Sequence, residues 1–322
     1  NKEKGAFMKE ANKKRILWID YAKAFAMFFV VIGHVNSGNY LTNWIYSFHM
    51  PLFFFLSGIT LKAYRGGGNI KLSKRILIPY FGYLLLYFLY DFMQVILLHK
   101  DINLVKAFIG IFIQIRGTEY TLGLWFLPLL FITEILEYLF VLQKDKIVIM
   151  MLIASIGFFY ASIFKQVLPW GIDAVPIAMV FVWLGYIYKN KFIFKFEYLK
   201  RYGLFIILPV LLLSIFWCNC NVTILGTSVD MHKMLYGNPF IYLLAAIHGI
   251  LFILLICQII FDKRDIHFLQ FIGGNTLHIY CLHGLILPFL KKGLEIFVNR
   301  IEIVNVSVFL QVIIAAVTIF IC

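Results

Sequence analysis

Long apolar runs alternate with short polar segments along the whole chain. A helix that crosses a bilayer needs about 20 predominantly apolar residues, and most of the runs have about that length. The pattern therefore predicts an all-α integral membrane protein with about ten transmembrane helices. The predicted spans are residues 16–36, 45–63, 75–98, 121–141, 146–164, 173–189, 202–217, 237–261, 268–290 and 303–322.

One apolar run, residues 103–114, is too short to span and is predicted to be a short interfacial or re-entrant helix. No internal repeat or linker divides the chain, so residues 1–322 are interpreted as a single membrane domain. Residues 1–14 are expected to form a cytoplasmic N-terminal tail. The last apolar run extends to Cys322, so a continuation of the natural chain is left open.

Lysine and arginine are distributed unequally between the two sets of loops. With the N-terminus inside, the inner segments hold 20 of the 29 basic residues and the outer loops hold 8, with Lys23 inside the first span. Because cytoplasmic loops carry an excess of Lys and Arg, the count favours an N-in, C-in arrangement with an even number of spans. Treating 103–114 as a further span would reverse every later loop and remove the asymmetry.

The composition agrees with a membrane protein and excludes several other classes. Hydrophobic residues make up 62% of the chain and charged residues 14%, whereas soluble domains are about half apolar and about one quarter charged. The net charge is +13, but the basic residues lie in short loops rather than in one patch, so no nucleic-acid partner is predicted. The five cysteines show no CxxC spacing, and no metal site is predicted.

The first span carries three ionisable residues on one face. Lys23 and His34 differ by about 20° around a helix, and Asp20 lies about 40° from His34. A rise of about 1.5 Å per residue separates Lys23 from His34 by roughly 16 Å along the axis. Ionisable groups inside a membrane indicate function, because burying a charge in hydrocarbon costs several kcal/mol. The alternative is that Lys23 extends to the inner surface, pairs with Asp20, and leaves His34 at the interface.

Two further segments place polar residues where they can meet this face. His49, in FHMPLFFFLSG (48–58), is interpreted as beginning the second helix at the outer surface close to His34, either as an interfacial residue or facing the same cavity. Ser57 and Gly58 are interpreted as small packing residues. On the ninth span, Tyr280 and His283 share a face with Thr276, while His278 points away and is expected to bond a neighbouring helix.

Five segments, taken in order, resemble the motifs of the acyltransferase-3 family of multi-span membrane O-acyltransferases. In the first of them Lys23 stands where the family usually has Arg and His34 stands where it has His, ten residues intervening. Lys offers a point charge instead of the planar fork of Arg. YGNP (236–239) is similar to the sugar O-acetylase branch. The five segments are DYAKAFAMFFVVIGH (20–34), FHMPLFFFLSG (48–58), KRILIPY (74–80), LWFLPLLF (124–131) and GGNTLHIYCLH (273–283).

The resemblance implies transfer of an acyl group, usually acetyl, from cytoplasmic acetyl-CoA to a hydroxyl of a cell-surface carbohydrate or its lipid-linked precursor. It implies a multi-pass protein of the plasma membrane, expected to be the bacterial inner membrane. The expected partners are acyl-CoA, the sugar acceptor and membrane lipids, with a homodimer among the open assembly states. A transporter or flippase of an envelope precursor is the alternative, although no inverted repeat is visible.

Roles follow for individual residues. His34 is expected to act as general base or acyl carrier, with Lys23 and Asp20 as its catalytic companions. Arg75 and Lys74 are expected to bind the CoA phosphates, unless they only anchor the third span at the inner surface. The expected substrate-binding residues are His49, Trp125, Tyr280 and His283, unless Trp125 belongs to the aromatic belt at the membrane interface.

A few other polar residues receive weaker interpretations. Glu134 and Glu137 lie inside the fourth span, where either could relay protons, although the family resemblance does not support them. Asp173 is interpreted as a helix cap. Asp230 and His232 are candidates for contacts with acceptor hydroxyls.

Overall fold

The computed structural model describes residues 16–35, 39–61, 68–118, 120, 123–141, 147–192, 202–226, 228–261, 264–301 and 308–322. Over these residues the chain forms twelve α-helices and no named strand, which confirms the all-α prediction. They are α2 (Leu17–Val35), α3 (Tyr40–Thr60), α4 (Gly68–Leu98), α5 (Leu104–Ile113), α6 (Phe126–Val141), α7 (Ile147–Ile163), α8 (Val175–Ile187), α10 (Gly203–Leu225), α11 (Pro239–Leu255), α12 (His267–Gly274), α13 (Thr276–Ile301) and α14 (Val308–Ile321). Short 3-10 helices occupy Pro169–Ala174 and Met231–Lys233, and single π-helical turns follow α8 and α11 at Tyr188–Phe192 and Ile256–Ile260.

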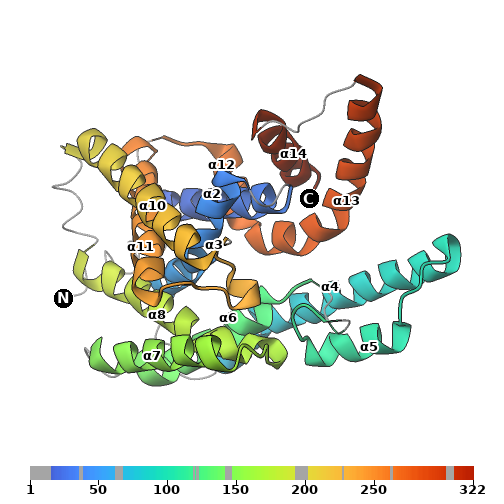
Figure 1. Cartoon of the computed structure of the whole chain (residues 1–322), viewed down its shortest axis with the longest axis horizontal. Helices are drawn as coiled ribbons and strands as arrows, with labels where there is room; N and C mark the ends of the chain where they lie inside the picture. Colours follow the sequence, from blue (N-terminus) through green and yellow to red (C-terminus); the bar gives the residue numbers. More distant parts are fainter. Residues whose placement is uncertain are drawn as a thin grey trace, which may run out of the picture.

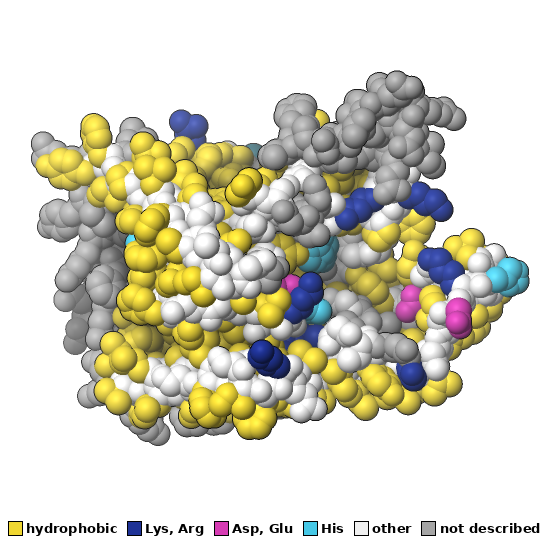
Figure 2. All heavy atoms as spheres, in the orientation of Figure 1, with side chains coloured by type: hydrophobic (Ala, Val, Ile, Leu, Met, Phe, Trp, Pro, Cys, Tyr) yellow, Lys and Arg dark blue, Asp and Glu magenta, His cyan; other side chains and the backbone are white. Residues whose placement is uncertain are grey.

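Five helical segments in the described part of the chain are long and apolar enough to cross a membrane. Large hydrophobic side chains cover much of the surface, as expected for a protein that faces lipid, and Figure 2 shows hydrophobic side chains on the left and along the lower edge of one face. Several passes through a membrane are therefore supported, while the count of ten spans and the N-in, C-in arrangement stay predictions. The five segments are Leu17–Val35, Leu72–Leu98, Pro169–Asn190, Phe205–Leu225 and Pro239–Ile260.

Helices α2 and α3 lie at the centre of the bundle (Figure 1). Helix α3 packs on α8, α2 and α11, while α12 lies against α2 and α10 lies against α11. Helices α6, α7 and α8 form one side of the view, and α4 and α5 extend away from the centre (Figure 1). The separate short helix expected at 103–114 is present as α5, which begins at the side-chain cap of Asn103 and packs on α4.

Some predicted boundaries were wrong for identifiable reasons. A capping box formed by Asn39 and Thr42 starts α3 at Tyr40, so His49 lies in the middle of this helix instead of beginning it. Helix α6 starts only at Phe126, and α10 continues to Leu225, where Gly226 ends it with a φ of 73°.

The predicted single span 268–290 is divided into α12 and α13 at Asn275. Gly273 sits so close to α2 that a Cβ at this position would lie 2.1 Å from the carbonyl oxygen of Asp20. Only glycine permits this approach. The break between α12 and α13 therefore lies beside Asp20, and the first turns of α13 face the interior of the bundle.

Candidate active site

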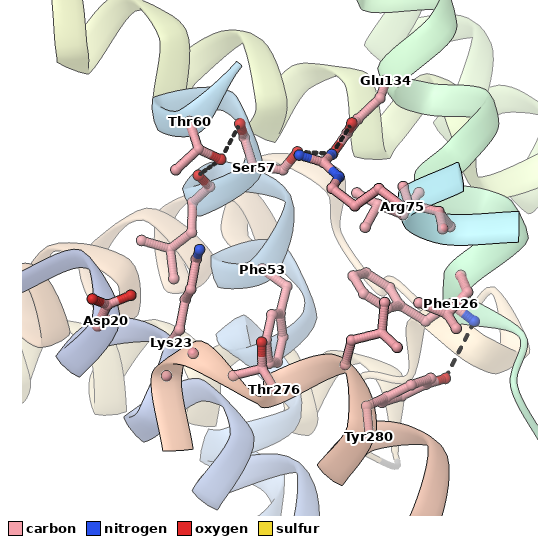
Figure 3. A pocket seen from close by; sticks show the side chains of 17 residues that line it. Asp20, Lys23, Phe53, Ser57, Thr60, Arg75, Phe126, Glu134, Thr276 and Tyr280 are labelled. Carbon is pink, nitrogen blue, oxygen red and sulfur yellow. Dashed lines mark hydrogen bonds and ion pairs between the residues drawn. The ribbon is translucent and has the colours of Figure 1, made fainter. Parts of the chain in front are cut away.

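A cavity of about 440 Å³ opens between α2, α3, α4, α6, α12 and α13, and we call it the polar cavity after the charged side chains in its otherwise largely apolar wall. Figure 3 shows Lys23 reaching from α2 toward the end of the cavity marked by Ser57 and Thr60, with Tyr280 and Phe126 at the other end. Four residues predicted from the sequence meet here although they come from three helices. The predicted residues on the cavity wall are Asp20, Lys23, Arg75 and Tyr280.

Glu134, to which the sequence assigned no firm role, contacts two other side chains of the polar cavity. The Arg75 Nη2 atom lies 2.5 Å from Glu134 Oε2, and the Ser57 hydroxyl donates to Glu134 Oε1 at 2.6 Å. Ser57 was interpreted as a packing residue, and the structure adds a hydrogen bond to Glu134, whereas the neighbouring Gly58 packs closely against α8. The signal available in the sequence was an acidic residue inside a span, which rarely lacks a partner.

A second pocket, of about 420 Å³, lies beside His34, and we call it the histidine pocket. His34 and Tyr46 line it together with Lys291 from α13. The ring centroid of His34 lies 5.2 Å from that of His283. His49, His232 and Lys291 lie within electrostatic range of the His34 imidazole. The structure thus gathers four histidines from three helices and one loop.

Hydrogen bonds fix the orientation of two of these rings. The Nδ1 atom of His283 lies 2.6 Å from the carbonyl oxygen of Tyr280, and that of His49 lies 2.8 Å from the carbonyl oxygen of Ile45. A carbonyl oxygen can only accept, so Nδ1 carries the hydrogen in both side chains when they are neutral. The Nε2 atom of each ring then presents a lone pair. The Tyr46 ring lies 5.0 Å from His49 and also lines the histidine pocket.

Tyr280 connects the polar cavity with the histidines. Its ring lies on the cavity wall, its hydroxyl accepts a hydrogen bond from the Phe126 backbone N–H at 3.3 Å, and its centroid is 5.6 Å from that of His283. Tyr280, His283 and His34 therefore form a continuous series of ring contacts between the two spaces. A continuous open passage between them stays a prediction.

Two comparisons with known proteins gave no match, neither among curated proteins nor among solved structures. The third matched a family, described as an acyltransferase domain, over residues 16–322. The chain belongs to the acyltransferase-3 family. This match covers nearly the entire chain and includes both the polar cavity and the histidine pocket.

Trp125 in this acyltransferase lies in a cluster built from three loops. Its ring centroid is 5.3 Å from that of His232 and 5.4 Å from the Arg116 guanidinium carbon. Burial lowers the pKa of His232 below its ordinary value, so its ring is neutral near neutral pH. The substrate-binding role of Trp125 stays a prediction, but its neighbours place it near the histidines.

Asp173 belongs to the same region and was wrongly interpreted as a helix cap. Its carboxylate forms a fully buried ion pair with Arg116 and accepts a hydrogen bond from the Leu168 N–H at 2.8 Å. Helix α8 begins after Ala174 without a side-chain cap. From the sequence, Arg116 was interpreted only as one of the basic residues in the predicted outer loops.

Two further residues considered in the sequence analysis, Lys74 and His278, line neither space of the candidate site in the acyltransferase. Lys74 is exposed and does not line the polar cavity, whereas Arg75 at the next position does line it. His278 points away from the histidine pocket and forms a 2.7 Å hydrogen bond with the Tyr83 hydroxyl of α4, which confirms its predicted interhelical role.

Proposed function

We propose that this acyltransferase moves an acyl group, with acetyl as the preferred one, from cytoplasmic acyl-CoA to a hydroxyl of a cell-surface carbohydrate or its lipid-linked precursor. The observation that carries the proposal is the contact of His34 with His283, which Tyr280 links to a cavity lined by Lys23 and Arg75. This arrangement supplies one polar space for a donor and another for an acceptor.

The polar cavity is suited to the donor because its cations can meet the phosphates of CoA. Arg75 has five N–H donors in a planar fork, of which the contact with Glu134 uses the Nη2 end. Lys23 lies deeper, as a point charge on the same wall. The exposed Lys74 would add attraction at the mouth. The acyl group would then extend toward Tyr280 and the histidines.

The reaction needs a base, because an alcohol is a weak nucleophile at neutral pH. In the proposed step, His34 takes the proton of the acceptor hydroxyl while its oxygen attacks the thioester carbonyl carbon. The new C–O bond forms, the C–S bond breaks, and the thiolate of CoA receives the proton that His34 had accepted. His283 and His49 would hold the acceptor and the reacting carbonyl near His34. An acyl-imidazole on His34 is the other route, and trapping of an acylated enzyme would select it.

The acceptor is assigned to the histidine pocket, where Tyr46 and Lys291 accompany His34. Trp125 and His232, close to this site, present an aromatic ring and a neutral imidazole that could meet a sugar face and its hydroxyls. The proposed location is the plasma membrane, and specifically the bacterial inner membrane, with the acceptor at the outer surface.

The test is transfer of radiolabelled acetyl from acetyl-CoA by the purified full-length protein, with and without a sugar acceptor. His34→Ala should reduce transfer by at least about 100-fold, the usual contribution of a general base. His278→Ala is the matched control, because it removes an imidazole outside the histidine pocket, and it should keep most activity. Near-normal turnover by a well-folded His34→Ala protein would contradict the role of His34. Movement of an envelope precursor without acetyl transfer would favour the transporter alternative.

A further inference from the structure

Glu134 is a buried carboxylate in the wall of the polar cavity, and the proposed reaction gives it no task. The residue is 4% exposed and lies between Ser57 of α3 and Arg75 of α4. Each of its two carboxylate oxygens accepts one of these contacts, as Figure 3 shows. Three helices therefore meet at a single acidic side chain.

The two members of the ion pair differ in how firmly the surroundings hold them. The Glu134 side chain is 5% exposed, whereas that of Arg75 is 49% exposed. A buried carboxylate needs a charged or hydrogen-bonding partner, because desolvating it alone costs several kcal/mol. A half-exposed arginine can adopt many rotamers at little cost. Glu134 is therefore the fixed member, and it determines where the Arg75 guanidinium lies.

The contact leaves part of the guanidinium able to bind a second anion. It is made through Nη2 and Oε2, and a guanidinium carries five N–H donors. Lys23 is also within electrostatic range of Glu134. The cavity wall thus holds two basic side chains, Lys23 and Arg75, and two acidic side chains, Asp20 and Glu134.

We propose that Glu134 is a positioning residue for the donor: with the help of Ser57 it holds the Arg75 guanidinium on the cavity wall, where the remaining N–H groups meet a phosphate of acyl-CoA. This inference rests on the proposed function, since it assumes that the cavity binds acyl-CoA. Glu134 acts through Arg75 and touches neither the thioester nor the acceptor hydroxyl.

The experiment is a double-mutant cycle on the full-length enzyme, with acetyl-CoA as the varied substrate. Glu134→Gln keeps the size of the side chain and removes its charge. It should raise the KM for acetyl-CoA about tenfold, the effect of weakening one charge-assisted hydrogen bond, and leave kcat within about twofold. Arg75→Ala should raise the KM at least as much. The double variant should match Arg75→Ala alone, because Glu134 has no effect without Arg75.

Glu137→Gln is the matched control, because it makes the same chemical change one turn along α6. Glu137 is fully buried, is absent from the cavity wall, and has no hydrogen-bond partner for either oxygen among the described residues. Its substitution should leave both KM and kcat within about twofold of the parent enzyme, an expected range for a change outside the binding cavity.

Ser57→Ala serves as a second variant if Glu134→Gln fails to fold. It removes only the hydroxyl that donates to Glu134 and should raise the KM for acetyl-CoA about threefold in the parent enzyme. In the Arg75→Ala background it should not change the KM. A fall in kcat with unchanged KM, additive effects of the two substitutions, or a lower KM for Glu134→Gln would each overturn the inference.

The outcomes also separate this inference from the proposed function. If Arg75→Ala raises the KM while Glu134→Gln has no effect, the inference fails and the proposed function stands. If the parent enzyme does not use acetyl-CoA at all, both fail.

Discussion

Arg116 shows what a single buried charge requires in this protein. Its side chain is 1% exposed and the partner carboxylate of Asp173 is fully buried. The guanidinium also donates to the carbonyl oxygen of Met231 at 3.2 Å and lies over the Trp125 ring. One side chain therefore ties the loop after α5 to the loop before α8 and to the loop before α11. These loops surround Trp125 and His232, so the pair shapes the surroundings of the proposed acceptor site.

Removing one member of this ion pair should be costly. Arg116→Met leaves Asp173 buried without its counterion, and we expect a loss of about 3–5 kcal/mol in the free energy of unfolding. The double variant Arg116→Met/Asp173→Asn should recover part of that loss, because no charge is then left unpaired. Thermal unfolding of the purified protein in detergent measures both.

The control for this prediction is an ion pair whose basic member is exposed. Lys233 lies 3.6 Å from Asp230 and its side chain is 67% exposed, so Lys233→Met should change stability by no more than about 0.5 kcal/mol. An equally small effect of Arg116→Met would mean that Asp173 finds another partner or becomes protonated at little cost.

At the scale of elements, the close crossing of α3 and α8 holds the centre of the bundle together. A Cβ on Gly58 would lie 1.9 Å from the carbonyl oxygen of Val182, and one on Gly185 would lie 1.9 Å from that of Phe55. Small residues allow membrane helices to approach backbone to backbone. Since Ser57 precedes Gly58, this crossing also positions the hydroxyl that reaches Glu134.

Alanine at either crossing glycine should separate the two helices. Gly58→Ala and Gly185→Ala are each expected to lower the thermal unfolding midpoint and, by moving Ser57, to raise the KM for acetyl-CoA. The control is Gly82→Ala on α4, where a Cβ meets nothing within 4 Å. Alanine there should be neutral or stabilising by about 0.5–1 kcal/mol, because glycine weakens a helix interior. A Gly58→Ala protein as stable as the Gly82→Ala protein would contradict this account of the crossing.

For the whole molecule, the important property is that the two candidate substrate spaces lie apart in the bundle, and we propose that donor and acceptor approach them from opposite ends. Arg75 lies near the start of α4 and His34 near the end of α2, so the polar cavity and the histidine pocket lie toward different ends of the bundle. The Lys and Arg distribution predicts that the Arg75 end is cytoplasmic. Donor and acceptor could then react without either of them crossing the membrane completely.

Cysteine labelling tests this orientation. Cys220 and Cys322 are the two partly exposed free cysteines, and both are first changed to Ser. In this background a membrane-impermeant thiol reagent should label Tyr40→Cys in right-side-out spheroplasts. It should label Tyr202→Cys only after permeabilisation. Tyr40 is 88% exposed at the start of α3 and Tyr202 is 59% exposed before α10, so neither position is buried inside the protein. The opposite pattern would reverse the predicted orientation.

The sequence alone determined the helical architecture and several of the side-chain arrangements in the candidate site. Apolar runs long enough to cross a bilayer can bury their backbone hydrogen bonds only as helices or closed barrels, and the runs are of helical length. Helical periodicity placed Tyr280 and His283 on one face and His278 on the other, which their contacts confirm. The ordered motifs indicated the family that residues 16–322 match.

Only the tertiary structure decided which charged residues pair and where the helices begin or break. Arg75 meets Glu134 across 59 residues, Ser57 meets Glu134 across 77, and Arg116 meets Asp173 across 57. Periodicity defines the face of a helix on which a residue lies, but it does not define which helix that face contacts. The break at Asn275 lies next to the close contact between Gly273 and α2, and α3 begins early because Asn39 and Thr42 cap it. Long-range packing therefore selected Glu134 and Arg116, whose partners no local pattern of one sequence can specify.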